Sequence, residues 1–168
     1  MSILQFTRQG AAPRPAALDI EAQRLPMHTA ADWQRAIIEE CRRQRTLTPS
    51  VFAYLKTAGL LDRCTFLASE GPADPLRFCY IGAPTLRVLG RAWGRSVLNQ
   101  PVDLDPHEEF AHRVGAEYAE AMGAGEAVFN RFSVTGLGRP FVYTGAVVGW
   151  SEGGRRAVLS AIDVLTIH

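Results

Sequence analysis

The chain has 168 residues, 47% of them hydrophobic, which is enough to bury the core of one ordinary domain. Its net charge of +1 comes from 18 basic and 17 acidic residues, and this balance argues against binding nucleic acid through bulk attraction to phosphate. No apolar stretch approaches the roughly 18 residues of a membrane helix, and the start lacks the order of a signal peptide, so we expect a cytoplasmic protein.

Residues 1–28 are predicted to form an extended or flexible leader. Gly10, Pro13, Pro15 and Pro26 interrupt this stretch, which contains few large apolar side chains. Such a segment buries too little apolar surface to offset the entropy of ordering it.

Residues 29–62 are predicted to form an N-terminal helical segment. Trp33, Ile37 and Cys41 recur at the spacing of one helical turn. A second helix is predicted to begin at Thr48-Pro49, because a capping residue followed by proline is typical of a helix start. The apolar faces of these helices must cover either the sheet or a second subunit.

Residues 63–168 are predicted to form the main domain. Two short strands, Cys64–Ser69 and Leu76–Ile81, are separated by a Gly- and Pro-containing turn and indicate a hairpin. Short irregular helical pieces follow from Thr85 to Trp93. Residues Val128–Thr135, Pro140–Trp150 and Arg156–Ile167 then predict three strands joined by tight glycine turns, which is an antiparallel meander.

One long amphipathic helix precedes these strands. Asp105-Pro106 predicts its start, with Asp105 as the cap and Pro106 in the first helical position. Phe110, Val114 and Tyr118 then recur on one face. The charged residues Arg113, Glu117 and Glu120 are predicted to occupy the other, solvent-facing side. The predicted fold class is therefore α+β, with a five-stranded antiparallel sheet, helices on one face, and the N-terminal helices before it.

The order of these elements resembles the PAS domain family over roughly Arg63 to Leu165. The resemblance is carried by Leu76–Gly82, by Val88–Trp93, and by the long helix running into Gly125-Glu-Ala-Val128. In the last of these, Ala127 stands where PAS domains usually have proline. The chain is especially similar to stand-alone PAS-like proteins of alphaproteobacteria, which begin with a short helical segment.

This resemblance implies a signalling sensor rather than an enzyme. PAS domains bind a small molecule or cofactor between the long helix and the sheet, so the resemblance implies a ligand site here, with a ligand that the sequence does not identify. We expect its lining to be Phe110, Val114 and Tyr118 from the helix and Phe132 and Tyr143 from the strands. The alternative is that all five side chains simply fill the core.

The resemblance also implies protein–protein interaction, because PAS domains often dimerise through an N-terminal helix. Trp33, Ile37 and Ile38 are therefore the residues predicted to form a homodimer or partner surface. No kinase, DNA-binding or cyclase segment is recognisable in the sequence, so we expect any output to pass through a signalling partner.

Two residues indicate alternative functions. Some PAS sensors hold haem iron through a histidine on the long helix, and His112 is the residue that would do so here, although helical geometry places it away from the Phe110/Val114/Tyr118 stripe. Alternatively, Asp163 is an acid within an apolar strand and is a candidate general base of a small isomerase or hydrolase. Otherwise the sequence contains no recognisable catalytic motif and no spacing typical of a metal site.

Overall fold

Six strands and five α-helices make up the part of the chain that the computed structural model describes, residues 17–168. The strands are β1 (Asp19–Arg24), β2 (Cys64–Ser69), β3 (Arg77–Tyr80), β4 (Val128–Thr135), β5 (Phe141–Glu152) and β6 (Arg155–Ile167). The helices are α1 (Asp32–Arg42), α2 (Pro49–Thr57), α3 (Ala83–Leu89), α4 (Arg91–Val97) and α5 (Glu108–Ala124). Among these described helices, none is both long and apolar enough to cross a membrane.

The strands form one antiparallel sheet in the order β1-β4-β5-β6-β2-β3. The hairpin β2–β3 and the meander β4–β5–β6 were both predicted, and their bounds agree with the prediction within one or two residues. Pairing of β2 with β6, which sets Cys64 opposite Ala161, joins the hairpin to the meander. The α+β class is confirmed.

The predicted number of strands was wrong, because the sheet has six rather than five. The additional strand, β1, lies within the predicted leader and pairs with β4 from Asp19 opposite Thr135 to Arg24 opposite Asn130. Ile20 and Ala22 are half-buried and pack against the core, and ladder hydrogen bonds add to this contact. The alternation of apolar and polar residues here is thus a strand signal that the prediction of a leader overlooked. Residues 1–16 of the predicted leader lie outside the described residues.

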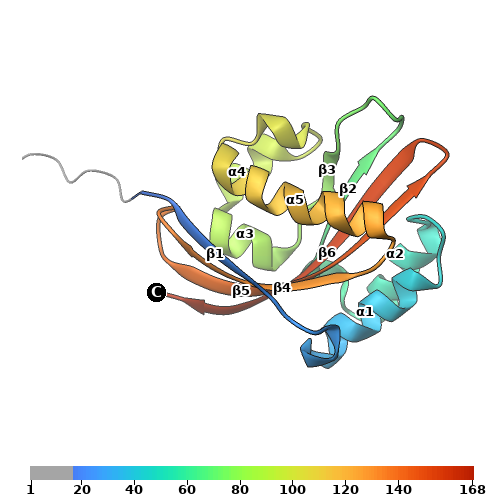
Figure 1. Ribbon diagram of the computed structural model, residues 1–168, viewed down its shortest axis with the longest axis horizontal. Coiled ribbons are helices and arrows are strands. Elements are labelled where there is room, and N and C mark those ends of the chain that lie inside the picture. The colour runs from blue at the N-terminus through green and yellow to red at the C-terminus, as the bar shows by residue number, and fades with distance from the viewer. Residues whose placement is uncertain (1–16) are drawn as a thin grey trace, which may run out of the picture.

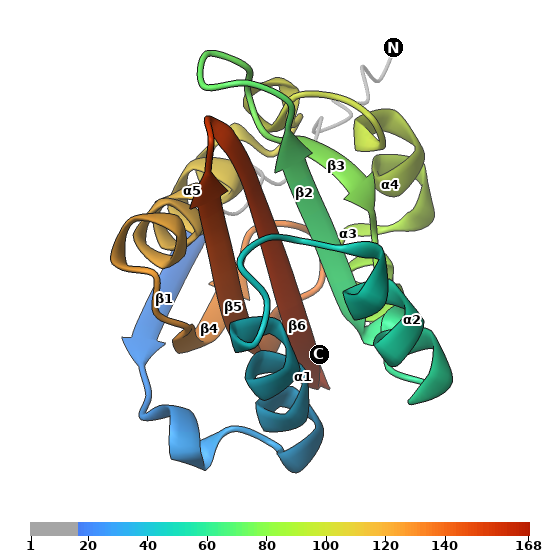
Figure 2. The same cartoon turned by 90° about the vertical axis from the view of Figure 1, so that its right-hand side faces the viewer.

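Helices cover both faces of the sheet: those of the predicted main domain share one face, and the N-terminal helices, whose cover was left open, lie on the other (Figure 1). Helices α3, α4 and α5 lie on one side, and α1 and α2 lie on the other, as the turned view also shows (Figure 2). Successive strand residues point to opposite faces. Val128 and Val147 accordingly pack with Tyr118 of α5, whereas Phe129 and Val148 pack in a second core with Ile37 of α1.

Helix α1 is part of the core of the single chain. Ile37 and Ile38 are 0% and 2% exposed, and Gln34 donates a buried hydrogen bond of 3.0 Å to the carbonyl of Ala161 in β6. Neither isoleucine therefore offers the exposed surface expected for a dimer. Trp33, half-buried beneath the Arg63 guanidinium at 4.6 Å, retains some exposed area. A dimer through this helix stays a prediction.

Candidate functional site

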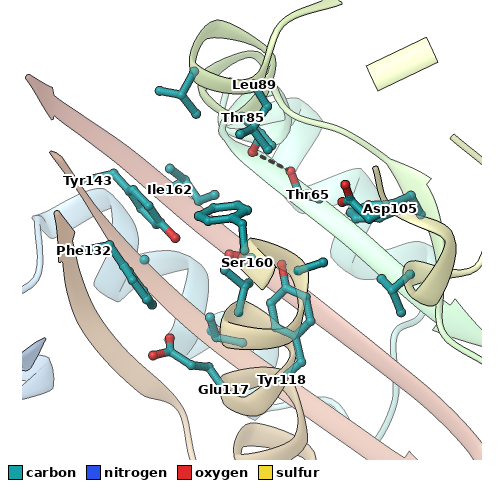
Figure 3. A pocket seen from close by; sticks show the side chains of 18 of the residues that line it. Thr65, Thr85, Leu89, Asp105, Glu117, Tyr118, Phe132, Tyr143, Ser160 and Ile162 are labelled. Carbon is teal, nitrogen blue, oxygen red and sulfur yellow. Dashed lines mark hydrogen bonds between the residues drawn. The ribbon is translucent and has the colours of Figure 1, made fainter. Parts of the chain in front are cut away.

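A cavity of about 50 Å³ lies between α5 and the face of the sheet that this helix covers (Figure 3). All five predicted binding residues line it: Phe110, Val114 and Tyr118 from α5, Phe132 from β4, and Tyr143 from β5. Four of them are buried and Val114 is half-buried. The structure thus brings the predicted set together, and its role in binding a ligand stays a prediction.

Two glycines of β5 explain why helix and sheet leave room here. At Gly149, an added Cβ would stand 2.5 Å from the backbone nitrogen of Met122 and 2.7 Å from the carbonyl carbon of Ala121, both in α5. At Gly145, on the same face of the strand, an added Cβ would meet only the Tyr143 ring, at 3.7 Å. The helix therefore touches the strand backbone at Gly149, and the cavity lies four residues away.

Aromatic rings form much of the wall. Phe132 and Tyr143 stack with centroids 4.8 Å apart and planes 12° apart, on neighbouring strands where they face each other directly. Phe78 of β3 and Trp93 of α4 meet edge to face at 5.7 Å. These contacts fix the rings, so the wall they form is rigid and apolar.

Hydroxyl groups interrupt this apolar wall. Thr65 of β2 and Thr85 of α3 are hydrogen-bonded at 3.0 Å, and Thr65 also accepts a bond of 3.1 Å from the backbone nitrogen of Gly82. These bonds hold the start of α3 against the sheet. Both threonines are buried and face the cavity together with Ser160 of β6.

The two tyrosine hydroxyls of the cavity stay protonated at neutral pH. Burial raises the pKa of Tyr118, the charges of Glu117 and Asp105 raise it further, and a hydrogen bond with Ser160 offsets only part of this. Burial likewise raises the pKa of Tyr143 well above its ordinary value of 10.0. Each hydroxyl can therefore donate as well as accept a hydrogen bond.

Asp105 is a buried carboxylate of the cavity wall, with 7% of its surface exposed. Its Oδ1 accepts hydrogen bonds from Trp93 Nε1 at 2.9 Å and from the backbone nitrogen of His107 at 2.8 Å. The helix begins at Glu108, so the predicted start at Pro106 was wrong by two residues. Asp105 does cap a backbone nitrogen, but it also anchors α4 through Trp93.

Glu117 is the second buried carboxylate, although its place in the helix predicted a solvent-facing residue. It is 5% exposed and lies between the cavity and a surface hollow that also contains Arg24, Arg113 and Glu120. Burial raises its pKa, and a hydrogen bond with Asn130 and the charge of Arg113 offset this in part. In Figure 3 its carboxylate lies beneath Phe132.

Sequence reasoning missed the polar residues of the cavity, which include Thr65, Thr85, Glu117 and Ser160. Asp105 was identified only as a cap. Ser160 alone had a visible signal, because it interrupts the apolar run of the last strand. The threonines come from different elements, and only the tertiary fold brings them together.

His112 lies on the outer side of α5, away from the cavity in which the haem hypothesis expected it, and haem binding stays a prediction that the structure does not test. Its side chain is exposed and borders a surface hollow with Glu108 and Glu109, and it is not among the residues that line the cavity. Rotation of about 100° per residue carries position 112 away from the inward stripe.

Asp163 also lies outside the cavity, so the structure does not bring it to the site where a general base was expected, and that role stays a prediction. Ile162 lines the cavity, and the next residue of a strand points to the opposite face. Asp163 is half-buried and pairs across the ladder with Thr144.

Metal ligands do not gather in the described part of the chain, where no group of three His, Cys, Asp or Glu side chains is placed to hold an ion. Cys41 and Cys64 are buried, and burial raises the pKa of both thiols to about 12. Cys79 is exposed on β3. The two buried thiols thus have the character of small core residues.

The fold and the site together define an α+β protein with a mostly apolar internal cavity bordered by hydroxyl and carboxylate groups. No protein-family model, curated protein or solved structure matches the chain.

Proposed function

We propose that this chain is a signalling module of the PAS type, in which a small molecule bound between α5 and the sheet controls contact with a partner protein. The observation that carries the proposal is the meeting of Phe110, Val114, Tyr118, Phe132 and Tyr143 around one cavity. Concave, mostly apolar sites with a few convergent polar groups are typical of small-molecule binding.

The order of elements supports the same proposal. From β2 to β6 the chain runs through a hairpin, short helices, one long helix and a three-stranded meander, which is the order on which the resemblance rests. Strand β1 and helices α1 and α2 are additions to this unit. The proposal assigns no catalytic step to the chain and places it in the cytoplasm.

Ligand binding in the cavity would change the outer surface of the protein by moving helices rather than strands. The sheet is held by continuous ladders, whereas α3 and α4 are short and are separated by Gly90, whose φ is 92°. Val88 and Leu89 of α3 line the cavity. A ligand larger than the cavity must therefore displace α3 or α5, and this would change the outer surface that a partner contacts.

Native mass spectrometry of the purified protein, with and without a library of small apolar compounds, tests the proposal. We expect one small molecule per chain to be retained or captured. Gly145→Ala places a methyl group in the cavity without a clash, so it should weaken this binding while leaving the fold intact. Capture that is equal in Gly145→Ala and the wild type, or capture of no compound by the wild type, would contradict the proposal.

A further inference from the structure

The charge of the cavity wall has one sign. Asp105 and Glu117 both line it, and no lysine, arginine or histidine does so within residues 17–168. Two basic groups lie nearby outside the lining: His107 Nδ1 is 3.9 Å from Asp105 Oδ1, and the guanidinium carbon of Arg113 is 6.0 Å from the centroid of the Phe132 ring. A bound anion would therefore meet two carboxylates and no basic side chain in the cavity wall itself.

The Asp105 carboxylate offers one free oxygen to the cavity. Both of its hydrogen bonds are accepted by Oδ1, from Trp93 and His107, and none of the hydrogen bonds formed among the described residues reaches Oδ2. Figure 3 shows this carboxylate on the same side of the cavity as Thr65 and Thr85. Because Oδ1 of this buried carboxylate is already paired with two donors, a further donor would meet Oδ2, where the hydrogen bond would be charge-assisted.

The rings around this oxygen suit a cation with an apolar body. Trp93 is hydrogen-bonded to the same carboxylate, and Phe78 packs edge to face against it. Both rings line the cavity. Aromatic faces attract organic cations electrostatically and also pack against their alkyl groups.

The volume limits the size of the ligand. A cavity that holds one water needs roughly 10–15 Å³, so about 50 Å³ accommodates roughly four non-hydrogen atoms without movement of the walls. This is the size of a short alkylamine.

Building on the proposed ligand-binding function, we propose that the cavity recognises a small organic ammonium ion, with its nitrogen paired to Asp105 Oδ2 and its alkyl group among the aromatic side chains. Glu117, at the other border of the cavity, adds to the negative potential that favours a cation. The site selects against carboxylates of the same size, and binds a neutral alcohol more weakly than an amine.

The test uses three probes of nearly equal size and different charge: n-propylammonium, n-propanol and propionate. Binding is followed by the indole N–H resonances of the 168-residue chain, which has three tryptophans. The Trp93 signal, assigned by its loss in Trp93→Phe, reports directly on Asp105. Trp150 donates to the carbonyl of Gln44 at 3.1 Å in the core on the other face of the sheet, so its signal serves as an internal control.

We expect n-propylammonium to shift the Trp93 signal, with a dissociation constant about tenfold lower than that of n-propanol, the difference typical of one charge-assisted hydrogen bond. Propionate should cause no shift. Asp105→Asn keeps an Oδ1 acceptor for Trp93 and His107 and replaces the free oxygen with a donor, so it should abolish the tenfold preference while n-propanol still binds. Glu109→Gln removes one exposed charge from α5 and should leave the preference unchanged.

Two results would overturn the ammonium assignment while leaving the cavity as a ligand site: equal affinity for the amine and the alcohol, or a preference that persists in Asp105→Asn. A different result would overturn the proposed function itself, namely that none of the probes shifts Trp93, or that Gly145→Ala leaves every affinity unchanged.

Discussion

Glu117 shows how a single residue of a patterned helix can depart from its pattern. Its position on α5 predicts exposure, yet its side chain is buried below Phe132 in the view of Figure 3 and borders the hollow that Arg24 and Asn130 also line. Burial disfavours the charged form and raises the pKa from its ordinary value of 4.5, with Asn130, Arg113 and Arg24 acting in the opposite direction.

The raised pKa of Glu117 predicts that this residue lowers the free energy of unfolding as the pH rises. Because the folded state holds the proton more tightly than the unfolded state does, the contribution of Glu117 to stability is greatest below pH 4.5 and is lost as the pH rises through the folded pKa. We expect the unfolding free energy of the wild type, relative to Glu117→Gln, to fall with rising pH above 4.5, by at most about 1.4 kcal/mol per pH unit. Urea denaturation at several pH values measures this difference.

Glu120 provides a matched control with the opposite sign. Its two carboxylate oxygens accept bonds of 3.0 and 2.7 Å from Arg24, which lowers its pKa. Its contribution is therefore present at neutral pH and lost on acidification, so the difference between wild type and Glu120→Gln should rise with pH. Parallel slopes for the two variants would contradict the assigned environments.

At this scale the sequence predicts apolar site residues better than polar ones. Phe110, Val114 and Tyr118 follow from helical spacing, and Phe132 follows from strand alternation, because burial imposes these periods on the chain. Thr65 and Asp105 have no such signature. Their roles depend on partners from other elements, Thr85 and Trp93, that only the folded chain brings near.

At the scale of elements, the fit of α5 onto β5 determines whether a cavity exists. Contact at Gly149 requires the absence of a side chain, because the helix backbone occupies the position that a Cβ would take. At Gly145 the helix has moved away from the strand. The same residue type on the same face thus has two different roles.

This difference predicts opposite effects for the same substitution at the two sites. Gly149→Ala must push α5 from the sheet and should destabilise the protein by about 1 to 3 kcal/mol or more. Gly145→Ala meets no close neighbour, and removing a glycine from a strand should stabilise the protein by up to about 1 kcal/mol. Urea denaturation of both variants tests this. Equal destabilisation would mean that α5 lies equally near both residues.

The bounds of the strands and helices show which sequence patterns were sufficient to predict an element. The strands of the meander were predicted closely because glycine turns and alternation mark them. Strand β1 was missed because it is short and its alternating apolar residues, Ile20 and Ala22, follow a proline-containing stretch that predicted a leader. The start of α5 was misplaced by two residues because His107, whose backbone nitrogen Asp105 binds as a cap would, has a non-helical backbone conformation.

At the scale of the whole molecule, the sheet separates two cores. One lies beneath α5 and contains the cavity, and the other lies beneath α1 and α2 and is closed by Ile37, Val51 and Leu55, which have no exposed surface. The sequence predicted apolar faces on these N-terminal helices but left open whether the sheet or a second subunit covers them. Local patterns do not determine that choice, since either surface satisfies the same periodicity.

Because the sheet of the same chain covers α1, the stability of the second core should not depend on protein concentration. Ile37→Ala is expected to destabilise the protein by about 2 to 5 kcal/mol, the range typical of truncating a large core side chain. The loss should be the same over a hundredfold range of concentration, because it does not involve association. Glu39→Ala, an exposed change on the same helix, should stay within about 0.5 kcal/mol of the wild type. A loss for Ile37→Ala that shrinks or grows with protein concentration would instead place this helix in an interface between two copies of the chain.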